Sequence, residues 1–227
     1  MVELIGIVQS EWASLPYGLL PETLVAQAAS YSPSRRATFL AGRALLAAVL
    51  AQQHHLSTLP PLVVGPHGRP AFADPELPDF NLSHSGDWLW LALGRGPLGL
   101  DVEQQRPRRN LDKLMAHVLS AEELCWVEAE ADPLTAFYRL WTLREAVLKA
   151  CGRGLAGLGQ LTLSPALRQL HSQALAPGVI QVAEWQGCSL ALYQAGSGEA
   201  IRVRQWRGEA GFEACPLLWQ APWQLLA

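Results

Sequence analysis

Residues 97–103, Pro-Leu-Gly-Leu-Asp-Val-Glu, are the stretch that most constrains how this chain can fold and what it can bind. The run predicts a strand, in which side chains alternate between two faces. Asp101 and Glu103 then project from one face. Neighbouring carboxylates repel each other unless a cation lies between them, and Mg²⁺ binds through one or two carboxylates together with substrate phosphates. The pattern is that of a magnesium-binding strand, or simply of a strand that ends in a charged loop.

The composition is typical of a folded domain and excludes several function classes. The 227 residues are 50% hydrophobic and 16% charged, with a net charge of −3, which argues against nucleic-acid binding that relies on overall charge. We expect no membrane span, and residues 1–12 lack the basic start of a signal peptide. The four cysteines lie far apart without C-x-x-C spacing, which indicates reduced thiols in a cytoplasmic protein.

Helix and strand patterns alternate along the chain, which predicts a mixed α+β fold. A helix is expected over residues 34–53, after the cap and proline of Ser32-Pro33. A second helix follows the cap Asp132-Pro133 and ends at Gly152. Strands are expected over residues 2–8, 62–65, 80–83, 88–93, 179–185, 188–193 and 200–206. The apolar tail, 216–227, is expected to pack back on the body.

A faint internal repeat relates the two expected helices. Residues 39–46, FLAGRALL, align with residues 141–148, WTLREAVL, and strands follow each helix. The repeat predicts two similar α+β halves that meet near Pro97. We therefore expect an N-terminal half over residues 1–97 and a C-terminal half over 98–227.

Charged pairs on the two helices are further candidates for a site. Glu145 and Lys149 are four residues apart and hence neighbours on one helix face, about 5–6 Å apart at Cβ. Such a pair is usually a minor surface salt bridge, but this helix also carries apolar residues that predict a partly buried face. Arg36 and Arg43, seven residues apart, share a face of the earlier helix, which is also typical of a solvated surface.

Two other patterns do not carry the chemistry that they suggest. Residues 152–157 match G-x-G-x-x-G, but they follow a helix and open none, so dinucleotide binding is rejected. Ser83-His84 lacks the G-x-S-x-G elbow of a hydrolase, and adjacent strand residues point to opposite faces.

Five motifs in order make residues 33–155 similar to the Sfp-type 4'-phosphopantetheinyl transferases, including their enterobacterial holo-acyl-carrier-protein synthases. The motifs are RRATFLAGR at 35–43, GRP at 68–70, NLSHS at 81–85, GLDVE at 99–103 and WTLREAVLK at 141–149. Arg144 stands where many members have lysine, which keeps the charge. Residues 156–227 carry no motif that matches.

The resemblance implies a metal site and a catalytic pair. Asp101, Glu103 and Glu145 are expected to hold Mg²⁺ against the pyrophosphate of coenzyme A. Glu145, or a water beside it, would take the proton from the serine of the carrier protein. Lys149 would contact the pyrophosphate and help 3',5'-ADP to leave.

The resemblance also implies the fold and the nucleotide side. The family has two similar α+β halves, related by a pseudo-two-fold axis, with coenzyme A in the cleft between them. Arg36, Arg43, Arg69, Ser83 and His84 are expected to line the nucleotide side, chiefly its phosphates. Two halves in one chain would make a monomer sufficient for one site.

We therefore expect a cytoplasmic, magnesium-dependent transferase that moves 4'-phosphopantetheine from coenzyme A to a serine of an apo acyl, peptidyl or polyketide carrier protein. No nucleic-acid or membrane partner is expected. Charge neutralisation by a metal and by cationic side chains is the main need of such a phosphoryl transfer. The alternatives are a metal-dependent nucleotide phosphohydrolase and a carrier-binding module without activity.

Overall fold

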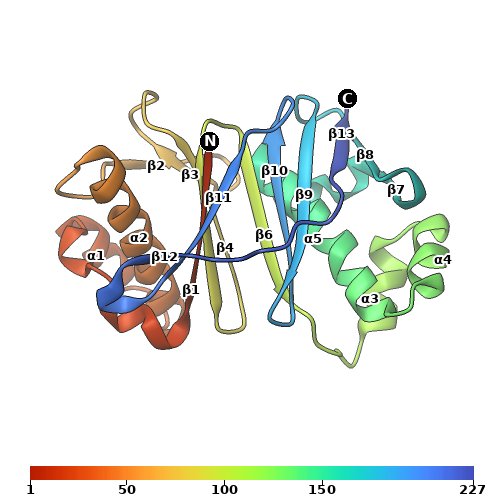
Figure 1. The fold of residues 1–227 in the computed structure, drawn as a ribbon, viewed down its shortest axis with the longest axis horizontal. Helices are drawn as coiled ribbons and strands as arrows, with labels where there is room; N and C mark the ends of the chain where they lie inside the picture. The colour runs from red at the N-terminus through yellow and green to blue at the C-terminus, as the bar shows by residue number, and fades with distance from the viewer.

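The computed structural model describes residues 1–227, apart from the side chain of Leu155. Two sheets lie side by side in the middle of the molecule, and helices flank them on the two outer sides (Figure 1). The mixed α+β class is confirmed. The helices are α1 (Glu22–Ala28), α2 (Pro33–His54), α3 (Leu111–Val118), α4 (Ala121–Ala129) and α5 (Pro133–Cys151). Within the described part of the chain, no helix combines the length and apolar character needed to cross a membrane.

The first sheet has the strand order β12-β11-β1-β5-β4. Its strands are β1 (Val2–Val8), β4 (Asp79–Ser85), β5 (Trp88–Gly94), β11 (Ile201–Trp206) and β12 (Phe212–Ala214). β1 pairs with β11 in parallel, and the other pairings are antiparallel. β11 and β12 come from the end of the chain, so residues distant in sequence complete this sheet.

The second sheet has the strand order β6-β10-β9-β13-β8-β7. Its strands are β6 (Leu98–Gln104), β7 (Leu161–Ser164), β8 (Gln169–Ser172), β9 (Gly178–Trp185), β10 (Cys188–Ala195) and β13 (Trp223–Leu226). A separate hairpin pairs β2 (Leu62–Val64) with β3 (Pro70–Phe72). The strands expected from the sequence are confirmed within a few residues at their ends.

Local sequence explains where α4 and α5 begin and where α5 ends. Ser120 and Glu123 form the capping box that starts α4. The Asp132 carboxylate accepts a hydrogen bond from the backbone N–H of Thr135 at 3.2 Å and so caps α5. Gly152, at φ 66°, adopts the left-handed conformation that ends α5. The ends predicted for α5 at Asp132 and Gly152 are confirmed, whereas Ser32 occupies the N-cap position of α2 without a side-chain hydrogen bond.

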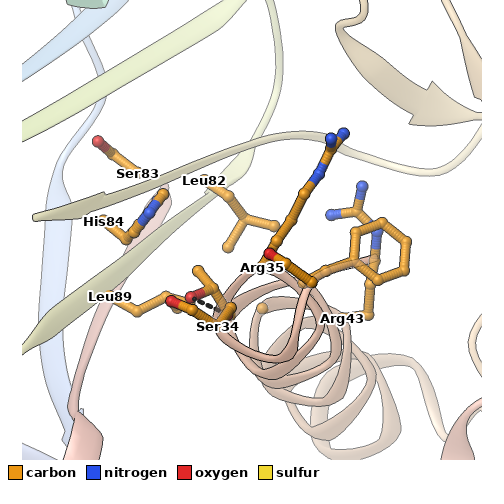
Figure 2. A pocket seen from close by; sticks show the side chains of 11 residues that line it. Ser34, Arg35, Arg43, Leu82, Ser83, His84 and Leu89 are labelled. Atoms are coloured by element: carbon orange, nitrogen blue, oxygen red, sulfur yellow. Dashed lines mark hydrogen bonds between the residues drawn. The ribbon is translucent and has the colours of Figure 1, made fainter. Parts of the chain in front are cut away.

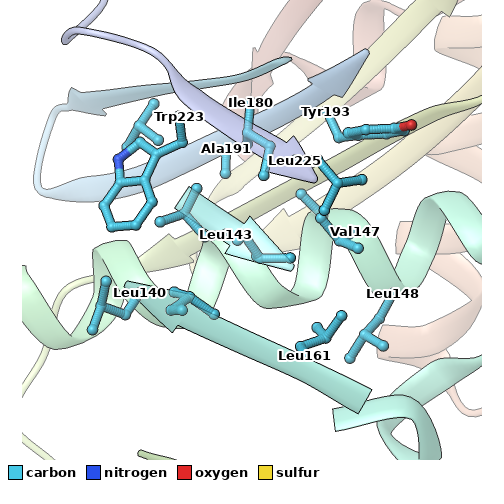
Figure 3. Packing of buried hydrophobic residues seen from close by; sticks show 14 of the residues in the cluster. Leu140, Leu143, Val147, Leu148, Leu161, Ile180, Ala191, Tyr193, Trp223 and Leu225 are labelled. Carbon is cyan, nitrogen blue, oxygen red and sulfur yellow. The ribbon is translucent and has the colours of Figure 1, made fainter. Parts of the chain in front are cut away.

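One long helix packs on each sheet, and a further core lies between the sheets. Figure 3 shows Leu143 and Val147 of α5 facing Ile180 and Trp223 of the second sheet. The shared core joins β1, β5, β6 and β10 with the C-terminal tail. That tail runs across the front of both sheets from β12 to β13 (Figure 1), with backbone hydrogen bonds to Val203 and Val182. The expectation that the tail packs back on the body is confirmed.

Candidate active site between the two sheets

The site is built on the line where β4, an edge strand of the first sheet, meets β6, an edge strand of the second. Every second side chain of β4 accepts a hydrogen bond from a backbone N–H of β6. The pairs are Asp79 with Leu98 (2.8 Å), Asn81 with Leu100 (3.1 Å), Ser83 with Val102 (3.1 Å) and Ser85 with Gln104 (3.0 Å). We call these four pairs the polar seam, because side chains rather than a backbone ladder fix the register of the two strands.

Asp101 lies on the polar seam and is 3% exposed. Its Oδ1 accepts hydrogen bonds from Ser83 Oγ at 2.9 Å and from Lys149 Nζ at 2.6 Å. Its Oδ2 is buried and has no partner among the described residues. Burial raises the pKa of the Asp101 carboxyl above its usual range, and the charge of Lys149 opposes that rise. Lys149 thus offsets part of the cost of burying this carboxylate.

Glu145 and Glu103 complete an acidic centre beside Asp101. Burial, and then the charge of Asp101, raises the pKa of Glu145 to about 7. Glu145 Oε1 is buried and finds no hydrogen-bond partner in the described part of the chain. Glu103 Oε2 accepts from Ser85 Oγ at 2.9 Å and from Arg108 at 3.5 Å. The structure therefore brings the two carboxylates of β6 and the one of α5 into mutual electrostatic range, as their effects on the Glu145 pKa show.

Gly99 lets α5 come close enough to β6 to form this centre. A Cβ at position 99 would overlap the carbonyl oxygen of Ala146 and press on Ala150. The glycine two residues before Asp101 therefore permits backbone contact between strand and helix. Glu145 and Lys149 face the carboxylates of β6 as a result of that contact.

The donor chemistry of the acidic centre fits Mg²⁺. Among the described residues, no three His, Cys, Asp or Glu side chains are grouped as a metal site. The partnerless Asp101 Oδ2 and Glu145 Oε1 are nevertheless hard oxygen donors, and a divalent cation would offset the burial and the charge repulsion that raise both pKa values. The expected set of Asp101, Glu103 and Glu145 stays a prediction.

A cavity of about 450 Å³ opens between α2 and β4 (Figure 2). Arg35 and Arg43 line it from α2, and Ser83 and His84 line it from β4. Arg43 Nε is buried without a hydrogen-bond partner within the described residues, and the guanidinium lies 5.1 Å from the centre of the Phe39 ring. Burial lowers the pKa of Arg43 to about 10. A buried cation in this state favours an anionic ligand in the cavity.

His84 connects this cavity with a second one. The neighbouring cavity of about 570 Å³ is lined by His84, Glu103, Arg106 and Arg108, with residues of α2 on its other side. Burial, followed by the positive charge of Lys149, lowers the pKa of His84, and Glu103 opposes this shift. His84 therefore stands between the α2 cavity and the acidic centre.

The residues expected on the nucleotide side divide into two groups. Arg43, Ser83 and His84 line the α2 cavity, but Arg36 is exposed and is not part of its lining. Sequence reasoning missed Arg35, which does line it. The missed signal was helical spacing, because Arg35, Thr38, Phe39 and Gly42 follow the i, i+3, i+4, i+7 pattern of one face.

Arg69 is bound by protein groups at the other end of the polar seam. Its Nη2 donates to both carboxylate oxygens of Asp79, at 2.7 and 2.8 Å, and to Leu98 O at 3.2 Å. Its Nε donates to Lys149 O at 3.0 Å. Arg69 also lines a cavity of about 210 Å³ beside Lys149. No local sequence pattern predicts that Asp79 and Arg69 pair.

A buried ion pair joins α5 to α4. Arg144 Nη2 donates to Glu123 Oε1 at 2.5 Å, and both side chains are almost wholly buried. Glu123 Oε2 also accepts from the Ser120 backbone N–H at 2.6 Å. The capping residue of α4 thus holds the residue just before Glu145, a link that spacing along the chain does not reveal.

Comparison with known proteins identifies the family. A family model described as the 4'-phosphopantetheinyl transferase superfamily matches residues 97–207. The 4'-phosphopantetheinyl transferase AcpT of Salmonella typhi is 43% identical over 149 residues, which are 64% of this chain and 73% of that protein. AcpT of Escherichia coli K12 is 42% identical over 150 residues, 64% of this chain and 72% of its own. A putative 4'-phosphopantetheinyl transferase of Haemophilus influenzae is 38% identical over 133 residues, 56% and 54% of the two chains. The chain belongs to the 4'-phosphopantetheinyl transferase superfamily and is, by this homology, a 4'-phosphopantetheinyl transferase.

Proposed function

We propose that this enzyme transfers 4'-phosphopantetheine from coenzyme A to a serine of an apo carrier protein in a magnesium-dependent reaction. The observation that carries the proposal is the acidic centre, where two buried carboxylate oxygens without partners, Asp101 Oδ2 and Glu145 Oε1, lie beside the cation of Lys149. Such a centre is costly unless it receives a cation. A magnesium ion with a pyrophosphate matches both its charge and its donors.

Asp101, Glu103 and Glu145 would hold the metal. Mg²⁺ bound there would neutralise charge on the pyrophosphate oxygens. Glu103 is already oriented for this by Ser85, and Asp101 by Ser83. These two serines come from the opposite sheet, so the polar seam would align the metal ligands of β6.

Glu145 and Lys149 would act on the transferred and the departing groups. The serine oxygen attacks the β-phosphorus of coenzyme A, and the bond from that phosphorus to the bridging oxygen of 3',5'-ADP breaks. Glu145, with its pKa of about 7, suits a group that takes the serine proton near neutral pH, directly or through a water. Lys149 reaches the acidic centre with its ammonium group and would stabilise charge on the leaving 3',5'-ADP.

The nucleotide would occupy the α2 cavity with its phosphates near the cationic side chains. Arg43 and His84 support this assignment because they line the cavity and because Arg43 is buried without an anionic partner in the described region. Ser83 would contribute its hydroxyl from the seam. Arg36, exposed one residue from Arg35, would approach a ligand from outside the cavity. Arg69 donates instead to protein acceptors at the other end of the polar seam.

The acceptor would be an acyl, peptidyl or polyketide carrier protein. The relatives are named as transferases of the phosphopantetheinyl group, which requires such an acceptor. Arg106, Arg108, Arg109 and Lys113 follow β6 in the sequence, and Arg106 and Arg108 line a cavity together with Glu103. A carrier protein that is acidic around its serine would be attracted to this basic run.

We further propose that the two halves, 1–97 and 98–227, are related by a pseudo-two-fold axis. The support is that each long helix, α2 or α5, packs on its own sheet. Strands β11 and β12 belong to the second half by sequence, and through the pairing of β11 with β1 they complete the sheet of the first half. One chain supplies both sides of the site, which supports action as a monomer. The four free thiols support a reducing, cytoplasmic setting.

Mass spectrometry of candidate apo carrier proteins tests the function. The carriers are incubated with the enzyme, coenzyme A and Mg²⁺, and a gain of the 4'-phosphopantetheine mass on the serine is expected, together with release of 3',5'-ADP. Release of nucleotide products without a mass gain on any carrier would instead indicate a phosphohydrolase. Carrier binding without either product would indicate a module without activity.

A further inference from the structure

Arg69 joins four segments that meet at the start of β6. It lies directly before β3 and donates to Asp79, the first residue of β4. It also donates to Leu98 O, on the first residue of β6, and to Lys149 O in the last turn of α5. These hydrogen bonds place one guanidinium at the crossing of hairpin, both edge strands and catalytic helix.

The pair of Arg69 and Asp79 is shielded and highly connected. The two side chains are 19% and 17% exposed. Besides Arg69, the Asp79 carboxylate accepts from the backbone N–H of Phe80 at 2.9 Å and of Leu98 at 2.8 Å. Asp79 therefore binds both the strand of the first sheet and the strand of the second, and Arg69 extends that connection to α5.

The chemistry of the contact requires arginine rather than a general cation. A planar guanidinium can hold a carboxylate and two carbonyl oxygens in fixed directions at once. The ammonium of lysine is a single charge on a flexible stem and cannot reproduce the same set of directions. Fixing the Lys149 carbonyl also fixes the backbone from which the Lys149 side chain extends. The Nζ atom of that side chain lies 2.6 Å from Asp101 Oδ1.

We infer that Arg69 is a positioning residue for Lys149 rather than a ligand of the nucleotide. Through the Lys149 carbonyl, Arg69 holds the last turn of α5 against the start of β6. The ammonium group of Lys149 is thereby positioned to contact both Asp101 and the pyrophosphate. The inference rests on the proposed transferase function for the role of Lys149. It differs from the role that the family resemblance implies for Arg69, because Nε and Nη2 are committed to protein acceptors.

Two variants that break the same pair from opposite sides test the inference. Arg69→Lys keeps the positive charge, and Asp79→Asn keeps the shape of its side chain. Arg95→Lys, at an exposed arginine outside the site, is the matched control. For each we would measure kcat of transfer, Kd of coenzyme A by calorimetry, and hydrogen exchange of the backbone over residues 146–152.

The positioning role predicts one pattern in both variants. Transfer kcat falls on the order of 10- to 100-fold, as expected for a slightly misplaced catalytic group, while Kd of coenzyme A stays within about 3-fold of the wild type. Hydrogen exchange over 146–152 becomes faster. The kcat of the double variant is no lower than that of the more impaired single variant, because both changes break the same contact. The control resembles the wild type in all three measurements.

Two results would overturn the inference. If Arg69→Lys weakens coenzyme A binding on the order of 10-fold or more while Asp79→Asn binds and turns over like the wild type, Arg69 is a nucleotide ligand. If kcat and hydrogen exchange match the wild type in both variants, the pair does not position α5. A wild-type enzyme that modifies no carrier would refute the proposed function itself, and hydrogen exchange would still report separately on whether Arg69 holds α5.

Discussion

The carbonyl oxygen of Ala146 occupies the space that a side chain on residue 99 would need, so Gly99 allows α5 to rest directly on β6. This contact places two carboxylates on the strand opposite a glutamate and a lysine on the helix. A glycine in the strand is therefore as important for the site as the charged residues that follow it.

Replacing this glycine tests the contact. Gly99→Ala should destabilise the protein by about 3 kcal/mol or more, since a backbone carbonyl cannot yield as a flexible side chain can. Gly159→Ala is the control, because a Cβ there meets no atom within 4 Å. Urea unfolding of both variants compares the free energies. An alanine at 99 that unfolds like the wild type would mean that α5 does not lie this close to β6.

The three carboxylates of the acidic centre should be needed for turnover and not for folding. We expect Asp101→Ala, Glu103→Ala and Glu145→Ala each to lower kcat, with an increase in activation free energy on the order of 3 kcal/mol. Chelation of divalent ions should abolish activity, and added Mg²⁺ should restore it. Glu128→Ala, at an exposed position of α4, serves as the control. A variant that keeps near-normal turnover at limiting Mg²⁺ would remove its residue from the ligand set.

Glu145 should make stability fall as the pH rises through the weakly acidic range. Its pKa of about 7 lies above the ordinary value of 4.5. The folded protein therefore retains a proton that the unfolded chain releases between these values, and folding loses free energy as the pH rises across the window. Because Glu145 is partly open to solvent, we expect a loss of about 1–2 kcal/mol, levelling off above pH 7.

Unfolding in urea at a series of pH values, with a chelator present, checks this dependence. Glu145→Gln should lack the loss, since the amide does not titrate. Mg²⁺ should offset the loss at pH 7 and above by favouring the ionised carboxylate. Identical pH profiles for the wild type and Glu145→Gln would show that the glutamate is not held in its protonated form.

The basic run after β6 should affect the carrier protein and not coenzyme A. Arg109 and Lys113 are both exposed near the start of α3. Replacing them together by glutamate should raise KM for an acidic carrier on the order of 10-fold and reduce its salt dependence, because complementary charge mainly speeds encounter. KM for coenzyme A should not change. If the variant has the same KM as the wild type for the carrier as well as for coenzyme A, the basic run is only a solvated loop.

Most elements of the fold could be predicted from local pattern, because periodicity and caps are properties of neighbouring residues. The cap at Asp132 and the stop at Gly152 are examples. The motifs likewise led to Asp101, Glu103, Glu145 and Lys149. The structure adds that the carboxylates of β6 face the serines of β4, which an isolated strand pattern does not contain.

The polar seam could not be predicted, because D-x-N-x-S-x-S reads as an ordinary half-buried strand. Its partners are backbone groups of a strand that belongs to another sheet, and only the packing of the sheets brings them together. The prediction of Arg36 in place of Arg35 in the lining of the α2 cavity has a simpler cause. One residue turns the side chain by about 100° around a helix, so a small error in choosing the buried face selects the wrong arginine.

The last prediction concerns the 3'-phosphate of coenzyme A. Arg43 and His84 line the α2 cavity from opposite sides, and Arg43 is a largely buried cation for which the described residues provide no ion pair. A phosphate bound between them would compensate the burial of the guanidinium. The wild type should therefore prefer coenzyme A over dephospho-coenzyme A in kcat/KM.

Arg43→Met should weaken the use of coenzyme A by about 2 kcal/mol in kcat/KM, the scale of a charge-assisted hydrogen bond. Use of the dephospho form should scarcely change, because the lost partner is absent from that substrate. Arg36→Met provides the comparison, since Arg36 is exposed outside the cavity and should have a smaller effect on this preference. Parallel kinetics with the two substrates measure the difference for each variant. If Arg43→Met impairs both substrates equally, the arginine serves the pyrophosphate or the packing of α2 and not the 3'-phosphate.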